Sequence, residues 1–273
     1  MRLPQRGEAF APGAVPGDRG QAIAVLRRAV ELGVNHIDTA AFYFSSLRSA
    51  NELINTALAP YPDDLVITTK VGPGRSPDGE FLPLARPDQL RGQVEENLRQ
   101  LGRDHLDVVN LRQHALADVA EHYGALAELQ EAGLIRHLGL SNIRPEHLEQ
   151  ARAVAPVVCV QNSFALGFRM PSQDGQLTRC GELGIAFVPF FAIAGEGREA
   201  GAGGAEHPEV EAIAKAHDAS TAQVRLAWTL GRGPHVLVIP GTSSLDHLAD
   251  NVAAGDLTLT DDDLARLDAV HNA

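Results

Sequence analysis

Three side chains that can hold or transfer a proton lie at the ends of two apolar segments. Asp38 and Tyr43 belong to GVNHIDTAAFYF, residues 33–44, and Lys70 belongs to DLVITTKV, residues 64–71. A neighbouring ammonium favours the phenolate, so Lys70 would make Tyr43 a stronger acid. A buried lysine keeps its charge only when it is paired, and Asp38 offers the carboxylate. The three together suit protonation of a carbonyl oxygen while hydride reaches the carbon, although each alone could be an ordinary turn or rim residue.

Alternating helices and strands must position these side chains. Apolar residues at helical spacing predict helices over residues 18–33, 49–59, 87–102, 121–133, 144–154, 172–184, 207–218, 220–231, 244–255 and 260–271. Short apolar runs predict strands over residues 35–40, 64–71, 105–112, 135–141, 157–163, 185–191 and 235–240. Strands buried on both faces and separated by helices indicate a parallel sheet.

The favoured fold class is an α/β (β/α)8 TIM barrel formed by residues 1–273 as a single domain. An open doubly wound sheet is the alternative. Residues 1–17 form an irregular Pro/Gly-rich segment without apolar alternation. The expected barrel therefore lacks its first strand at the N-terminus.

Composition excludes several classes of function. The net charge of -12 and the pI near 5.3 argue against a nucleic-acid partner and against an anionic membrane surface. No apolar segment is long enough to span a membrane, and the first residues do not resemble a signal peptide. Cys159 and Cys180 are too few for a disulfide framework, and no metal-ligand spacing occurs. We expect a cytoplasmic protein that is a monomer or a weak homo-oligomer and holds no metal.

Polar residues at the C-terminal ends of barrel strands are the ones expected to meet substrate. In this chain they are Asp38, Lys70, Asn110, Arg112, Ser141, Asn142, Gln161, Asn162 and residues 240–244.

The motifs GVNHIDTAAFYF, NELI, ITTKVG, LDVVNLR, GLSN, VQN and VIPGT followed by HLADN resemble the aldo-keto reductase superfamily in order and spacing. The resemblance covers roughly residues 20–270. It implies a (β/α)8 barrel that uses NADPH or NADH without a metal. It also implies that Tyr43 is the general acid, that Lys70 tunes it and that Asp38 orders the pair. By the same resemblance, Ser141, Asn142 and Gln161 would hold the nicotinamide carboxamide, and Phe190 would stack on its ring.

The fourth catalytic position departs from the family pattern. Where most members have a histidine, LDVVNLR places Arg112. A fixed cation can stabilise negative charge on the carbonyl oxygen without changing protonation. His114, two residues on, is the competing candidate if the strand continues that far. We favour Arg112, and a third interpretation is that it only forms a rim salt bridge.

The adenosine end of the cofactor is expected on PGTSSLDHLADN. Thr242, Ser243 and Ser244 precede a helix N-terminus, which presents N–H groups and hydroxyls to phosphate. Gly241 and His247 stand where the family often has cations for the 2′-phosphate of NADPH, while Asp250 and Asn251 match the pair that contacts adenine. NADPH is retained narrowly over NADH.

The expected partner is a small-molecule carbonyl substrate. The segments NHID, DVVNLR, VCVQN, VPFF and IPGTSS most resemble the microbial subgroup that includes pyridoxal reductases. Pyridoxal or a similar small aromatic aldehyde is therefore a specific candidate for the substrate. The competing hypothesis is an NADP(H)-binding barrel that is catalytically impaired and serves as a binding or regulatory module.

Overall fold

The computed structural model describes residues 17–44, 49–76, 80–167, 171–193 and 206–270. The chain separates into two compact units. Unit 1 comprises residues 1–161 and 241–245, and unit 2 comprises residues 162–240 and 246–273. The expectation about the N-terminal segment lies outside the described residues, apart from Gly17.

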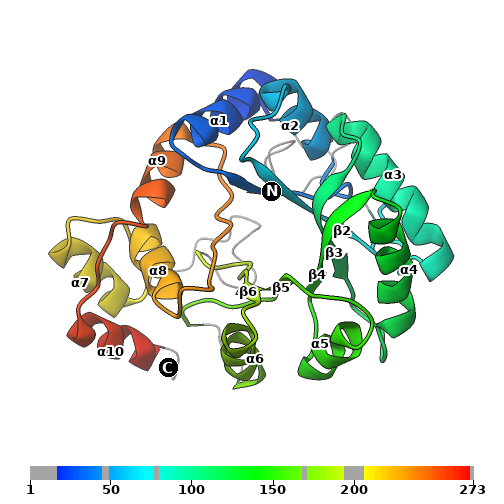
Figure 1. The fold of residues 1–273 in the computed structure, drawn as a ribbon. Helices are drawn as coiled ribbons and strands as arrows, with labels where there is room; N and C mark the ends of the chain where they lie inside the picture. The colour runs from blue at the N-terminus through cyan, green and yellow to red at the C-terminus, as the bar shows by residue number, and fades with distance from the viewer. Residues whose placement is uncertain (1–16, 45–48, 77–79, 168–170, 194–205, 271–273) are drawn as a thin grey trace. The chain divides into compact units, whose positions relative to one another are not determined.

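Unit 1 contains a parallel sheet in the order β1-β2-β3-β4-β5. Its strands are β1 (His36–Asp38), β2 (Val66–Val71), β3 (Leu106–Arg112), β4 (Ile135–Ser141) and β5 (Cys159–Gln161). Between them run the helices α1 (Arg19–Glu31), α2 (Ala50–Leu58), α3 (Leu90–Leu101) with the 3-10 turn η1 (Pro87–Gln89), α4 (Ala120–Glu131) and α5 (Pro145–Arg152). Figure 1 shows α2, α3 and α4 outside the strands β2, β3 and β4. Every helix and strand expected in this unit is present, with ends shifted by a few residues.

The two faces of this sheet differ in chemistry. Thr69 on β2 donates to Asn97 on α3, which identifies one face as covered by helices. Because side chains alternate along a strand, Lys70 lies on the opposite face. That second face carries mostly polar side chains from the five strands: His36, Asp38, Thr68, Lys70, Asn110, Arg112, Ser141, Cys159 and Gln161. A parallel sheet normally buries apolar residues on both faces, so this polar row indicates the functional face.

Helix boundaries in unit 1 follow from local chemistry. The side chain of Asp18 accepts from the backbone N–H of Gln21 and caps α1. Gly102 ends α3 in the left-handed region, with φ of 63°. A Cβ at Gly102 would come within 2.3 Å of the Nδ2 atom of Asn55. Glycine is therefore required there both by backbone conformation and by space.

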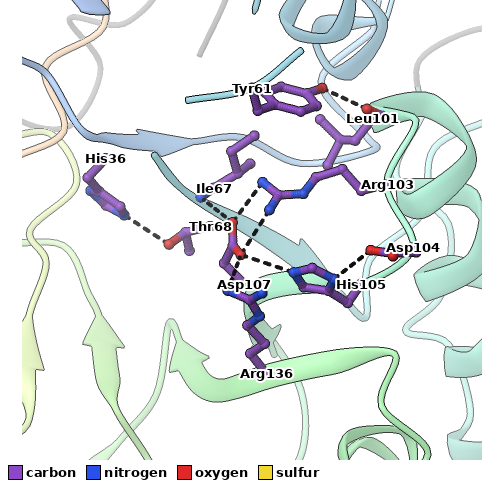
Figure 2. Close-up of polar contacts among 10 residues, drawn as sticks. All are labelled: His36, Tyr61, Ile67, Thr68, Leu101, Arg103, Asp104, His105, Asp107 and Arg136. Atoms are coloured by element: carbon purple, nitrogen blue, oxygen red, sulfur yellow. Dashed lines mark hydrogen bonds and ion pairs between the residues drawn. The ribbon is translucent and has the colours of Figure 1, made fainter. Parts of the chain in front are cut away.

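An ionic cluster fixes the N-terminal ends of β2, β3 and β4 (Figure 2). The carboxylate of Asp107 accepts from the backbone N–H of Ile67 at 3.0 Å and takes a two-point ion pair from Arg103 at 2.9 and 3.1 Å. Arg136 and His105 also approach this carboxylate, each at 3.7 Å. A buried carboxylate needs such partners. The cluster locks β2 against β3 at the end of the sheet away from Lys70.

Unit 2 packs its elements around an aromatic core. It contains α6 (Pro171–Glu182), β6 (Ala186–Phe187), α7 (Pro208–Ala216), α8 (Thr221–Leu230), most of α9 (Leu245–Ala253) and α10 (Asp261–Ala269). The ring of Phe164 stacks on Trp228 at 5.7 Å and meets Phe187 edge-on at 5.9 Å. All three side chains are fully buried. The three rings form a buried aromatic cluster within the unit.

The expected strand over residues 235–240 is wrong. Only Val236 pairs there, in an isolated parallel bridge with Phe187, and Leu237 is exposed. The partner segment is short because Pro189 has no N–H to continue a ladder beyond β6. The apolar run of residues 235–240 therefore finds too little strand to pair with.

Within the described ranges, no helix is long and apolar enough to cross a membrane.

Candidate active site

A buried ion pair joins the ends of β1 and β2. The ammonium Nζ of Lys70 lies 2.5 Å from Oδ1 of Asp38 and donates to the backbone carbonyl of Thr39 at 3.0 Å. Lys70 is 2% exposed and Asp38 8% exposed. At this depth, each charge depends on the other for stabilisation. The pairing expected between these two residues is observed.

Both residues stay charged in spite of their burial. Burial alone would lower the pKa of Lys70, but the Asp38 carboxylate and the nearby Tyr43 outweigh it, so this pKa is raised. Burial alone would raise the pKa of Asp38, but Lys70 and the hydrogen bond from Gln161 contribute to a net lowering of this pKa. The pair therefore supplies a permanent ammonium at neutral pH.

Tyr43 lies beside that ammonium. The Lys70 Nζ atom is 5.1 Å from the centre of the Tyr43 ring. The backbone N–H of Ala50, the first residue of α2, donates to the Tyr43 carbonyl at 2.8 Å and ties the tyrosine loop to the helix. Phe42 meets the Tyr43 ring edge-on at 5.0 Å. The phenol is thus held next to a fixed positive charge, as a proton donor requires.

A buried hydrogen-bond network on the helix-covered face anchors the same two strands. Thr39 donates to Asn51 at 2.7 Å, Asn51 donates to Asn97 at 2.9 Å, and Thr69 also donates to Asn97, at 2.5 Å. Thr39 follows Asp38 and Thr69 precedes Lys70, so the network holds the backbone of both charged residues. Sequence reasoning missed Asn97. The available signal was an amide in a buried helix position where an apolar residue is usual.

Three buried atoms near the pair have no hydrogen-bond partner, one of which is Nδ2 of Asn110, the register partner of Lys70. The Nε2 atom of Gln161 donates to Oδ2 of Asp38 at 2.7 Å, which leaves its Oε1 atom as an acceptor without a donor. The Oγ atom of Ser141 also has no partner. Ser141 and Gln161 are register partners on β4 and β5, so both groups lie side by side on the polar face. A donor–acceptor set of this kind fits a carboxamide, which offers both an N–H and a carbonyl.

Asn142 is engaged differently from its two predicted partners. Its Nδ2 atom donates to the backbone carbonyl of Gln113 at 2.9 Å, and the Gln113 side chain donates back to the Asn142 carbonyl. The residue adopts a positive φ of 59°. These reciprocal hydrogen bonds join the segment after β3 to the segment after β4, so the side chain of Asn142 holds the backbone around the site in place.

Arg112 ends β3 beside Ser141 and on the same face as Lys70. Its positive charge disfavours the charged form of Lys70 and so tends to lower the pKa of the lysine. His114 lies beyond the end of the strand and is exposed. His114 would share the face of Arg112 only if the strand continued to residue 114. The strand ends at Arg112, so this condition is not met.

The segments predicted to hold the rest of the cofactor fall into both units. Gly241 to Ser244 form a loop of unit 1 in which the Ser244 N–H donates to the Thr242 hydroxyl at 3.0 Å, and Gln21 donates to the Ser243 carbonyl at 3.2 Å. His247, Asp250 and Asn251 lie on one side of α9 in unit 2.

Phe190 also belongs to unit 2, where its N–H donates to the Asn162 carbonyl at 3.0 Å. The residues brought together within unit 1 are therefore Asp38, Lys70, Tyr43, Ser141 and Gln161, with Arg112 at the neighbouring strand end. Among the residues that the structure describes, no three His, Cys, Asp or Glu side chains are grouped so as to hold a metal ion.

Comparison with known proteins identifies the family. Residues 9–272 match the model of the Aldo/keto reductase family. Pyridoxine 4-dehydrogenase of Escherichia coli K12 is 42% identical over 262 residues, which cover 93% of this chain and 88% of the relative.

Solved structures agree. A thermostable aldo-keto reductase crystallised with the inhibitor epalrestat matches with a TM-score of 0.78 and 28% identity over 99% of this chain and 95% of its own. The aldo/keto reductase of Klebsiella pneumoniae, solved with NADP and acetate, has a TM-score of 0.78 and 27% identity over 93% of this chain and 86% of its own. The expected α/β barrel class and the expected oxidoreductase class are confirmed. This chain belongs to the aldo/keto reductase family.

Proposed function

We propose that this protein reduces an aldehyde or ketone to an alcohol, with Tyr43 as the proton donor to the carbonyl oxygen. The observation that carries the proposal is the buried Asp38–Lys70 pair, whose ammonium lies 5.1 Å from the Tyr43 ring. The ammonium stabilises the phenolate that remains after proton transfer. The negative charge that develops on the Tyr43 oxygen as it gives up its proton is thus stabilised by a cation that is already in place and does not move.

When bound, a nicotinamide dinucleotide would supply a hydride, which is one proton with two electrons, to the carbonyl carbon. The unpartnered Ser141 Oγ and Gln161 Oε1 atoms fit its carboxamide. Asp38 fixes the direction of the Gln161 amide, so one carboxylate orders both the proton donor and the carboxamide-binding group. Ser141, Asn142 and Gln161 of unit 1 are proposed to bind the nicotinamide carboxamide, and Phe190 of unit 2 is proposed to stack on the nicotinamide ring. Gly241, Thr242, Ser243, Ser244, His247, Asp250 and Asn251 form the adenosine end.

NADPH is the proposed form of the cofactor, with NADH as the alternative. The relative from Klebsiella pneumoniae was solved with NADP. In this chain the hydroxyls of Thr242, Ser243 and Ser244 offer neutral donors for phosphate.

The proposed substrate is pyridoxal or a similar small aromatic aldehyde. The support is the 42% identity to pyridoxine 4-dehydrogenase, an enzyme named for the corresponding alcohol.

We place the reaction in the cytoplasm and assign it to one barrel domain that acts as a monomer or weak homo-oligomer. The rival hypothesis of an impaired binding module does not account for a buried Asp38–Lys70 ion pair whose ammonium lies 5.1 Å from the centre of the Tyr43 ring.

Purified protein mixed with NADPH and pyridoxal is expected to consume NADPH, followed by the loss of absorbance at 340 nm. In reverse, NADP+ and pyridoxine are expected to give NADPH. A panel of aromatic and aliphatic aldehydes distinguishes a different carbonyl substrate from an inactive protein. Quenching of cofactor fluorescence with no turnover of any carbonyl would instead establish the binding module.

Arg112 is expected to donate to the carbonyl oxygen. Arg112→Ala should lower kcat about 10²- to 10³-fold, as loss of one donor to an oxyanion does elsewhere. His114→Ala, at an exposed site two residues away, is the matched control and should leave kcat unchanged. Full turnover by Arg112→Ala together with its loss in His114→Ala would transfer the role to the histidine.

A further inference from the structure

A rigid hairpin extends from the end of β2, two residues beyond Lys70. The Gly72 N–H donates to the Gln93 side chain at 2.6 Å, and Gln93 donates back to the Gly72 carbonyl at 3.3 Å. The Ala85 N–H donates to the same carbonyl at 2.9 Å and closes the base of the hairpin. A Cβ on Gly72 would lie 2.4 Å from the Arg112 carbonyl, so the segment passes directly against the end of β3.

The two arms of this hairpin are paired. The Leu82 N–H donates to the Gly74 carbonyl at 2.9 Å, the Ser76 N–H donates to the Glu80 carbonyl at 2.9 Å, and Arg75 pairs with Phe81 in an antiparallel bridge. Since the base and the described parts of both arms are hydrogen-bonded, the backbone that carries Phe81 is held in place. A backbone that is already held in place loses little entropy on binding.

Phe81 is a large apolar side chain left largely in water. It is 57% exposed, more than any other large apolar residue among those that the structure describes. The guanidinium of Arg75 covers one face of its ring, 4.3 Å from the ring centre. The uncovered ring area is therefore available to a ligand, and an exposed aromatic on a rigid support is typical of a binding surface.

Aromatic contacts connect Phe81 with the proton donor. The Phe81 ring centre is 6.3 Å from that of Phe42, and Phe42 is 5.0 Å from Tyr43. Phe42 is buried between them. Phe81 thus lies one ring beyond the residue that touches Tyr43, at the exposed end of a row of aromatic side chains that begins at the proton donor.

We propose that Phe81, stacked on Arg75, is a specificity-determining residue that holds the flat ring of an aromatic aldehyde while Tyr43 protonates its carbonyl. The inference rests on the proposed carbonyl reduction and adds the surface that selects the substrate class. Stacking needs a flat partner, so the contact favours aromatic aldehydes over aliphatic ones. Arg75 keeps the Phe81 ring in place from behind.

The test compares kcat/KM for pyridoxal, benzaldehyde and butanal in wild-type protein and in Phe81→Ala. The ratio of aromatic to aliphatic kcat/KM is expected to fall about three- to tenfold, through KM, as loss of one aromatic pair predicts. Phe81→Trp should restore the ratio because it restores a flat face. Leu82→Ala is the matched control, since Leu82 is 45% exposed on the same hairpin, and it should keep the wild-type ratio.

An unchanged ratio in Phe81→Ala, or an equal fall in Leu82→Ala, would overturn the assignment of Phe81. Either result leaves the proposed reaction standing, since butanal turnover reports on the proton donor and the cofactor without an aromatic ring. Absence of turnover with all three aldehydes in wild-type protein would overturn both.

Discussion

Tyr43→Phe is expected to lower kcat by about 10²- to 10⁴-fold, the range that general acid catalysis supplies. The substitution removes one oxygen and leaves the ring, so the edge contact with Phe42 and the approach of the Lys70 ammonium persist. The loss should appear in kcat with aromatic and aliphatic aldehydes alike, because both need a proton on the carbonyl oxygen. Stopped-flow measurement of NADPH oxidation separates this step from product release.

Cofactor binding is expected to survive in Tyr43→Phe, because the groups proposed for the carboxamide are Ser141 and Gln161. Quenching of NADPH fluorescence measures it. Tyr61→Phe is the matched control: the Tyr61 hydroxyl donates to the Leu101 carbonyl at 2.6 Å, so its loss should cost about 0.5–1.5 kcal/mol of stability and leave kcat intact. Wild-type turnover by Tyr43→Phe would remove this residue from the mechanism.

Much of unit 1 could be predicted because each of its helices and strands is specified by residues that are close together in the sequence. Apolar spacing and caps such as Asp18 and Gly102 depend on neighbours in the sequence. Parallel strands then bring their C-terminal ends to one edge, which is why Asp38, Lys70 and Gln161 could be grouped in advance. The hydrogen bonds from Lys70 and Gln161 to separate oxygens of the Asp38 carboxylate could not be predicted, since strand order does not specify which atoms meet.

The failures arise where the outcome depends on a partner segment. Residues 235–240 have the short apolar run of a buried strand, yet Pro189 shortens the neighbour that would pair with them. Asn97 bonds to Asn51 and Thr69 from other elements, and helical spacing contains no information about those contacts. Phe81 was passed over because the hairpin after β2 is defined by backbone hydrogen bonds that sequence pattern does not reveal.

The ion pair has a defined dependence on pH. The pKa of Asp38 is lowered in the folded protein, so its contribution to stability is present above the unfolded value of about 3.9 and is lost as pH falls through the folded pKa. The pKa of Lys70 is raised, so its contribution is present below about 10.4 and is lost as pH rises through the folded pKa. Between these limits the pair adds no slope to the free energy of unfolding.

Lys70→Met is expected to change that pH dependence. Removing one partner of a buried pair costs about 3–5 kcal/mol, because Asp38 is left as an uncompensated buried charge. Burial then raises the pKa of Asp38, so the variant should lose stability as pH rises from about 4 to 7, a range over which the wild-type pair is flat. Urea unfolding at pH 5 and pH 8 measures the difference. Turnover should fall together with stability, since the phenolate of Tyr43 loses its cation.

Two further variants isolate the charge from the packing. The chain has one other lysine, the exposed Lys215 on α7, so Lys215→Met makes the same chemical change without a buried partner and should leave stability and turnover unaltered. The double variant Asp38→Asn/Lys70→Met removes both charges and should recover much of the lost stability while remaining inactive. Recovery of turnover in the double variant would contradict the assigned role, because the ammonium would then be needed only to neutralise Asp38 and not to stabilise the Tyr43 phenolate.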